Sequence, residues 1–365
     1  MNSLVEIIRS ETALRGVLPF ARFMELALYH PGLGYYEMQK HGPGRRGDFY
    51  TSVSTGELFG RLLAFQFANW LEEIKSLPAP PVTRHPSLCL IEAGAHDGRL
   101  AGDILNWLQL ERPKLFGQIE YIILEPSPRR QEWQKETLKH FTNVRWLFAF
   151  SDARRQTPDA RFTGIIFSNE LLDAFPVHRY GWDAKNKTWF EWGVAVEGYK
   201  FVWVKIQPSA FSPQPSALES VLPDNYTIET SPTAENWWRE AAGVLARGKL
   251  MAIDYGFTSD EMFSPARTRG TLRAYFRHHA TDNILANPGD QDLTAHVNFS
   301  AIQKAGEESG LTTKFFGMQS KFLTEILKTQ FAIRNSQFAI PPRQFQTLIH
   351  PEHLGCAFRV LVQAR

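Results

Sequence analysis

The sequence has little cysteine, no long apolar run and almost no net charge. Its 365 residues include two cysteines, Cys89 and Cys356, which excludes a disulfide framework and favours a reducing compartment. No stretch of about 18 apolar residues is present to span a membrane. The 40 Lys and Arg and 38 Asp and Glu are interspersed, without the basic stripe of a nucleic-acid binder. The first residues read as a helix rather than a targeting segment, so we expect a cytoplasmic protein.

The glycine pattern of dinucleotide-binding folds is also absent. Residues 88–100, LCLIEAGAHDGRL, read as a buried strand, a glycine-containing turn and the start of a helix. The dinucleotide pattern G-x-G-x-x-G needs glycine at positions 96 and 99, where the chain has His96 and Arg99. The turn is therefore a candidate site for a cofactor without a pyrophosphate.

The same turn is similar to the methyltransferase pattern E-x-G-x-G-x-G, with His96 in place of the middle glycine. S-adenosyl-L-methionine (SAM) carries a sulfonium and an ammonium group, so a carboxylate at the end of the strand favours it electrostatically. The glycines let the backbone approach a ligand closely. We expect Glu92, Gly94 and Gly98 to bind SAM. The alternative is an ordinary strand, turn and helix of any α/β protein.

Two further predicted strands end close to acids. Residues 121–125 end on Glu125, whose carboxylate can accept hydrogen bonds from both ribose hydroxyls, and Ser127 and Pro128 suit the start of a helix. The next strand, 144–150, is followed by Asp152, which could face an adenine amine. The alternative for Asp152 is a solvated loop acid.

The fourth predicted strand, from Gly164, runs into the polar residues Asn169, Glu170 and Asp173. Ligands of open parallel sheets lie beyond the carboxyl ends of the strands, so these residues should lie beside the reactive methyl group. A helical turn would put the carboxylates of Glu170 and Asp173 on one face, where they suit a guanidinium. The competing interpretation of Asp173 is an acid that stabilises a helix N-terminus.

The chain as a whole predicts an α/β fold with a Rossmann-like sheet. Residues 1–80 read as mostly helical and are expected to cover the cofactor site. Residues 81–176 and 246–365 supply the SAM-binding core, which closes with an antiparallel pair of strands. Residues 177–245 contain short aromatic-rich strands and read as a β insertion between strands four and five, for recognition of a substrate or partner.

Taken in order, these motifs resemble the MidA-type SAM-dependent methyltransferases, whose mitochondrial members are complex I assembly factors that methylate a protein arginine. The resemblance covers nearly the whole length, and its ordered matches are more specific than any one alone. The matching stretches are 23–24, 27–29, 34–36, 47–52, 59–60, Glu92-x-Gly94, 169–177, 254–256, 270–275, His278, 288–289 and 292–297.

The resemblance implies transfer of the SAM methyl group to a nitrogen of a protein arginine. Glu170 is the first candidate to orient the guanidinium and accept its proton, and Asp173 is the second. His296 is a candidate hydrogen-bond partner or proton acceptor, with a structural loop histidine as its alternative. Asp48 and Thr51 would cover the cofactor from the N-terminal side.

The chain departs from the family pattern at three places. His96 puts a Cβ and an imidazole into the cofactor turn, Ser54 and Thr55 replace a stretch with Pro and Glu, and Asn298 replaces an Asp. Three hypotheses stay open: a methyltransferase for arginine of a protein such as a respiratory-complex subunit, a SAM methyltransferase with another acceptor, and a binding or assembly module without turnover. No spacing typical of a zinc site is present, and the oligomeric state is not specified.

Overall fold

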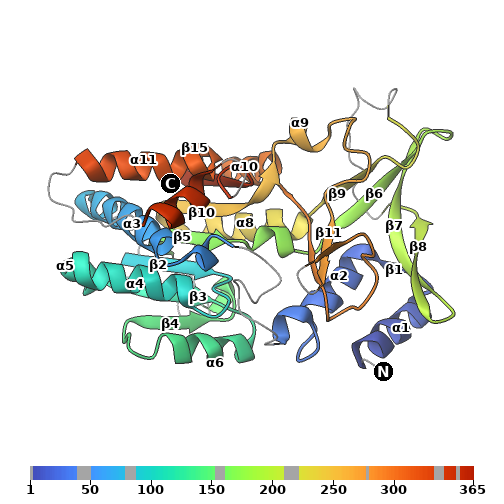
Figure 1. Ribbon diagram of the computed structural model, residues 1–365, viewed down its shortest axis with the longest axis horizontal. Coiled ribbons are helices and arrows are strands. Elements are labelled where there is room, and N and C mark those ends of the chain that lie inside the picture. The colour runs from blue at the N-terminus through green and yellow to red at the C-terminus, as the bar shows by residue number, and fades with distance from the viewer. Residues whose placement is uncertain are drawn as a thin grey trace. The chain divides into compact units, whose positions relative to one another are not determined.

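The chain folds into two compact units, each assembled from three separate segments (Figure 1). The computed structural model describes residues 3–38, 51–78, 88–152, 161–208, 222–276, 279–332, 341–350 and 354–365. What we call the sheet unit comprises Gly42–Leu172, Asn236–Gly256 and Ile302–Arg365. The antiparallel unit comprises Met1–His41, Asp173–Glu235 and Phe257–Ala301.

The sheet unit is built on a mostly parallel sheet with the order β15-β16-β10-β5-β2-β3-β4. Only β16 runs antiparallel to its neighbours β10 and β15 in this order, so the predicted terminal antiparallel pair and the Rossmann-like fold are confirmed. The strand order reverses between β2 and β5, and ligands of such sheets bind at that switch point. The strands are β2 (Leu88–Ala93), β3 (Ile119–Leu124), β4 (Val144–Leu147), β5 (Phe162–Asn169), β10 (Leu245–Phe257), β15 (Thr312–Met318) and β16 (Phe358–Ala364).

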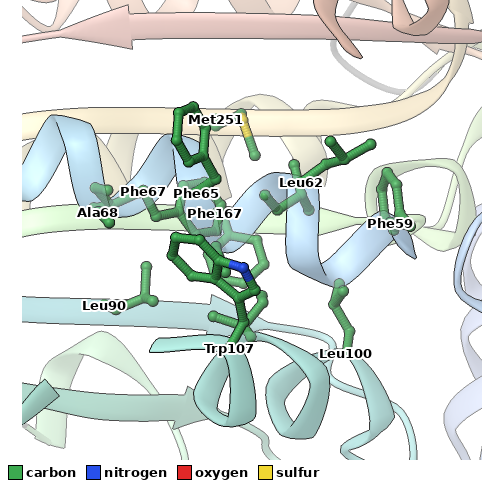
Figure 2. Close-up of a cluster of buried hydrophobic side chains, with 14 of the residues drawn as sticks. Phe59, Leu62, Phe65, Phe67, Ala68, Leu90, Leu100, Trp107, Phe167 and Met251 are labelled. Carbon is green, nitrogen blue, oxygen red and sulfur yellow. The ribbon is translucent and has the colours of Figure 1, made fainter. Parts of the chain in front are cut away.

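One face of this sheet is covered by helices α3, α4 and α11, which share an apolar core with it. Figure 2 shows side chains of α3 and α4 in this core. Phe67 of α3 lies 4.8 Å from Phe167 of β5 between ring centroids, and Phe65 lies 6.0 Å from Trp107 of α4. The helices and short 3-10 turns of the unit are η2 (Val53–Thr55), α3 (Leu58–Ser76), α4 (Arg99–Glu111), α5 (Pro113–Phe116), α6 (Pro128–Thr137), α8 (Pro232–Val244), α10 (Phe299–Glu308), α11 (Gln319–Ala332) and α12 (Pro342–Ile349). The first residues of α8 and α10 belong to the antiparallel unit.

The antiparallel unit contains two small sheets, β1-β7-β6-β9 with β8 paired to β7, and β12-β11-β13. Phe20 and Phe23 of α2 pack against Trp203 and Phe201 of β8, with ring centroids 4.9 and 5.5 Å apart. Its elements are α1 (Ser3–Arg15), β1 (Leu18–Pro19), α2 (Phe20–Tyr29), η1 (Tyr35–Glu37), η3 (Leu172–Ala174), β6 (His178–Asp183), β7 (Thr188–Glu197), β8 (Lys200–Ile206), β9 (Thr227–Thr230), α9 (Ser259–Met262), β11 (Arg273–Phe276), β12 (His279–Thr281), β13 (Asp292–Thr294) and β14 (Val297–Asn298).

These units differ from the division expected from the sequence. Helix α3, which we assigned to the N-terminal region, belongs to the sheet unit because its apolar side chains lie in the core of that sheet. The segment Phe257–Ala301, which we assigned to the core, belongs with the aromatic strands. Within the described ranges, no helix is both long and apolar enough to cross a membrane.

Candidate functional site

The turn between β2 and α4 has an unusual backbone at three positions. Gly94, His96 and Gly98 have φ angles of +74°, +48° and +84°, the left-handed region that favours glycine. A Cβ on Gly94 would also lie 2.9 Å from Cδ1 of Leu171. His96 therefore keeps the conformation that a glycine would adopt at its position, although its side chain differs from the family pattern.

The side chain of His96 is 44% exposed, and Nδ1 lies 3.8 Å from Oδ1 of Asp97. The carbonyl oxygen of His96 accepts a hydrogen bond of 3.0 Å from Nε2 of Gln134. Burial raises the pKa of Asp97, but His96 and Arg99 outweigh it and leave that pKa below its usual value. A carboxylate thus remains charged in the turn, beside the ring.

Glu92 lies at the end of β2 and is 2% exposed. Its Oε2 accepts a hydrogen bond of 2.5 Å from the hydroxyl of Tyr121 on β3. Burial raises the pKa of Glu92 to about 7, the hydrogen bond from Tyr121 lowers it, and the charge of Asp97 raises it. Glu92 is therefore a carboxyl group whose ionisation a nearby cation would favour.

Glu125, at the end of β3, is fully buried and has several protein partners. Its carboxylate pairs with the guanidinium of Arg130 at 2.9 Å and accepts hydrogen bonds from the backbone N–H of Ser127 and from Nε2 of Gln134. Ser127 caps α6 and Pro128 occupies its first turn, as predicted. Binding of ribose hydroxyls by Glu125 would have to compete with these partners.

Asp152 and Thr51 both stabilise local turns. Oδ2 of Asp152 accepts hydrogen bonds from the backbone N–H groups of Phe148 and Ala149, at 2.9 and 3.1 Å. Oγ1 of Thr51 accepts one from the N–H of Ser54 at 3.1 Å. Asp48, the other residue predicted to cover the cofactor, lies outside the described residues.

The carboxyl end of β5 carries buried polar groups at the switch point. Among the residues that the structure describes, Oγ of Ser168 and Oδ1 of Asn169 are buried without a hydrogen-bond partner, and Nδ2 of Asn169 donates to Oε1 of Glu170 at 3.0 Å. Buried polar atoms without protein partners are typical of a ligand or water site. This edge of the sheet therefore fits a polar cofactor.

The helical turn expected over residues 170–173 is wrong at Glu170, and the structure has a shorter 3-10 turn, η3, at Leu172–Ala174. Glu170 has a φ of +53°, and the following N–H groups of Leu171 and Leu172 donate to Oδ2 of Asp254 at 3.1 and 2.8 Å instead of continuing a helix. Asp254, on β10, is fully buried. Burial and the charge of Glu170 raise the pKa of Asp254 against these N–H groups. Asp254 thus fixes the backbone on which Glu170 stands.

Asp173 begins the antiparallel unit and belongs there to a cluster of acids and tyrosines. Its carbonyl oxygen accepts a hydrogen bond of 2.9 Å from the N–H of Ala295. Tyr36 donates its hydroxyl to Oδ1 of Asp292 at 2.8 Å, and Asp292 lies directly opposite Tyr275 in the pairing of β13 with β11. Burial raises the pKa of both tyrosines, and the charges of Asp173 and Asp292 raise it further, while the charge of Arg273 lowers the pKa of Tyr275.

His296 lies in the same unit but in a cationic environment. Its ring stacks on Phe257 with centroids 4.8 Å apart, and the guanidinium of Arg267 lies 4.2 Å from the Phe257 ring centroid. Burial, followed by the charges of Arg267 and Arg273, lowers the pKa of His296 to about 4. The imidazole is therefore neutral at neutral pH and a weak base.

Comparison of the sequence with known protein families identifies the chain as a methyltransferase. Residues 62–317, more than half of the chain, match the model of a family described as "Putative S-adenosyl-L-methionine-dependent methyltransferase". The chain belongs to this methyltransferase family. The resemblance predicted from the motifs and the cofactor SAM are thereby confirmed.

Members and relatives of the methyltransferase family match the chain over most of its length. A superfamily member from Burkholderia thailandensis, crystallised with S-adenosyl-homocysteine (SAH), is 31% identical, with a TM-score of 0.82 over 100% of this chain and 92% of that one. Protein arginine methyltransferase NDUFAF7, mitochondrial, of Danio rerio is 25% identical over 98% of this chain and 86% of its own. The Drosophila melanogaster homolog is 26% identical over 85% and 71%.

In this SAM-dependent methyltransferase the structure adds residues that the sequence did not single out. Tyr121 contacts Glu92, Arg130 contacts Glu125, and Tyr36 contacts Asp292. Tyr36 lies in the matching stretch 34–36 and Tyr121 begins the predicted strand 121–125, but the sequence assigned a role to none of the three. Asp254 had a sequence signal, because it lies in the matching stretch 254–256. Within the described residues, no group of three or more His, Cys, Asp or Glu side chains is placed to hold a metal ion.

Proposed function

We propose that this methyltransferase transfers the methyl group of SAM to a side-chain nitrogen of a protein arginine. The observation that carries the proposal is the cluster formed by Tyr36, Tyr275, Asp173 and Asp292. The names of the relatives from Danio rerio and Drosophila melanogaster, which describe protein arginine methyltransferases, support it.

The cluster has the chemistry that recognises a guanidinium. Asp173 and Asp292 are 6% and 3% exposed. The charges of both acids raise the pKa of Tyr36 and of Tyr275. A guanidinium binds carboxylates through paired hydrogen bonds, and its face stacks on aromatic rings. A lysine ammonium would use the charge but not the planar hydrogen-bond pattern.

Chain connectivity links Asp173 of the cluster to Glu170, the first candidate proton acceptor. Asp173 follows Glu170 by three residues, so the chain holds their Cα atoms within about 11 Å of each other. Glu170 stands at the carboxyl end of β5, where the sheet reverses its order. We therefore include both Glu170 and Asp173 among the candidate proton acceptors of the proposed reaction.

Methyl transfer to arginine requires alignment of the nitrogen with the methyl group and removal of one proton from that nitrogen. When bound, SAM supplies a methyl group whose bond to sulfur breaks as the bond to nitrogen forms, leaving SAH. In our proposal Glu92 binds the ammonium, the Gly94 turn admits the adenosyl part, and Asp173 and Asp292 orient the guanidinium. Glu170 or Asp173 accepts the proton that the nitrogen loses. His296, with its low pKa, serves as a hydrogen-bond partner.

The test is labelling of a cell lysate by the purified protein with SAM carrying a tritiated methyl group. We expect label in a protein, and methylarginine after acid hydrolysis and chromatography. Label on another residue type or on a small molecule would contradict the arginine proposal but leave a SAM methyltransferase. Absence of label, together with no heat on titration with SAH, would favour a binding module without turnover.

A further inference from the structure

We propose that Tyr121 is a positioning residue for the cofactor: its hydroxyl holds the carboxylate of Glu92 so that one oxygen is fixed by the protein and the other is left for the ammonium of SAM. The inference rests on the proposed function only where that function assigns the ammonium to Glu92. It does not depend on which acceptor is methylated.

The contact between the two side chains is specific in place and in chemistry. In the parallel pairing of β2 with β3, Tyr121 lies opposite Leu90, and Glu92 lies opposite Ile123. The side chains of Glu92 and Tyr121 are therefore diagonal neighbours on one face of the sheet. The 2.5 Å separation between Oη and Oε2 is in the range of charge-assisted O–H···O bonds.

The surroundings show that the hydroxyl of Tyr121 is not needed for packing. Tyr121 is completely buried and belongs to the apolar core, together with Leu90, Ile123 and Phe167. A phenylalanine would bury the same ring without a polar atom that requires a partner. The phenol instead gives its hydrogen bond to a carboxylate at the end of β2, where the cofactor turn begins.

The hydrogen bond also affects the charge of Glu92. The titratable groups that act on Glu92 are Tyr121 and Asp97, and the burial that dominates raises its pKa to about 7. A cationic ligand favours the ionised form, so affinity for the ligand should rise as the pH increases through this pKa. Loss of the Tyr121 hydrogen bond removes an interaction that lowers the pKa, and the rise in affinity should move to higher pH.

The experiment is calorimetric titration with SAH from about pH 5.5 to about pH 7.5, where the ligand's ammonium stays largely charged. We compare the wild-type protein with Tyr121→Phe. We expect the variant to bind SAH about tenfold more weakly at neutral pH, as for loss of a hydrogen bond to a charged group, and its pH profile to move upward.

Two controls separate positioning from damage to the fold. The first is the ligand 5′-methylthioadenosine, which lacks the amino-acid part of SAH: its affinity should not change with pH or between the two proteins. The second is Tyr226→Phe, which removes another buried hydroxyl, one that donates to the carbonyl oxygen of Ser264, and should match the wild type. Asp103 of α4, whose pKa burial raises to about 6, is checked with Asp103→Asn, which should leave the midpoint unchanged.

The outcomes distinguish this inference from the proposed function. An unchanged SAH profile in Tyr121→Phe, or equal losses for SAH and 5′-methylthioadenosine, overturns the positioning role and leaves the methyltransferase. If Tyr121→Phe does not fold, Glu92→Gln decides, because the proposal requires SAH to bind more weakly to that variant than to the wild type. If Glu92→Gln binds SAH as tightly as the wild type, the ammonium assignment in the proposed function fails as well.

Discussion

The two units place their candidate residues on different kinds of scaffold. In the sheet unit, Glu92, Glu125 and Asn169 each stand at or directly after the end of a parallel strand, and each was found from the local sequence pattern. In the antiparallel unit, the bond between Tyr36 and Asp292 joins residues 256 positions apart. The candidate cofactor residues are thus specified by strand ends, and the acidic cluster by long-range packing.

This difference between the units predicts which of two properties, cofactor binding or methyl transfer, each unit should control. A parallel sheet fixes the place of its ligand by topology alone, whereas the chemistry of an acceptor depends on side chains gathered from several segments. Substitutions at the strand ends and the Gly94 turn of the sheet unit should therefore change SAH binding. Substitutions in the acidic cluster should change methyl transfer while SAH binding is preserved.

The largest effect is expected for Gly94→Val in the sheet unit. The φ of +74° disfavours any side chain, and the new Cβ would meet Leu171 at 2.9 Å. The turn must then move, and we expect SAH affinity to fall by about 100-fold, the combined cost of backbone strain and overpacking. Isothermal titration calorimetry measures this.

The matched control is Gly102→Ala, inside α4, where a Cβ would have 3.7 Å to its nearest neighbour, Leu138. It should stabilise the helix by about 1 kcal/mol in thermal unfolding and leave SAH binding unchanged. Wild-type affinity in Gly94→Val would show that the turn does not approach the ligand.

Most of the sheet unit could be predicted from the sequence, because its strands are continuous apolar runs that each end near a polar group. The antiparallel pair of terminal strands was predicted as well. The conformation at Glu170 could not be predicted, because it depends on hydrogen bonds from Leu171 and Leu172 to Asp254, more than 80 residues away.

The antiparallel unit was predicted less completely. Its aromatic strands were found, but not that β1, only two residues long, pairs with β7, or that the segment 257–301 joins them. Strands this short carry no periodicity, and their pairing depends on the neighbours that bury them. The partner of Asp292 was hidden for the same reason, since nothing local links it to Tyr36.

An intermediate effect is expected for Asp292→Asn in the antiparallel unit. Asparagine keeps an oxygen that can accept from Tyr36 but removes the charge that would pair with a guanidinium. We expect kcat/KM for an arginine acceptor to fall by about 10- to 100-fold, as for loss of a hydrogen bond between charged groups, with SAH affinity within about twofold by calorimetry. Asp282→Asn, at an exposed position in the same unit, is the control.

The comparison between the units would be broken if Asp292→Asn weakened SAH binding as much as it slowed methyl transfer. The cluster would then act on the fold or on the cofactor rather than on the acceptor. Unchanged methyl transfer would remove Asp292 from the proposed guanidinium site.

The smallest effect is expected for His96→Gly, which restores the glycine of the family pattern. Glycine relieves about 1 kcal/mol of strain at a φ of +48° but adds a similar conformational entropy to the unfolded chain, so stability should change little. We expect SAH affinity within about threefold of the wild type, because the backbone of the turn is already the one glycine would adopt. Lys187→Gly, at a φ of +52° in the antiparallel unit, should behave alike in thermal unfolding without any effect on SAH. A tenfold change in affinity in His96→Gly alone would mean that the imidazole itself takes part in, or obstructs, cofactor binding.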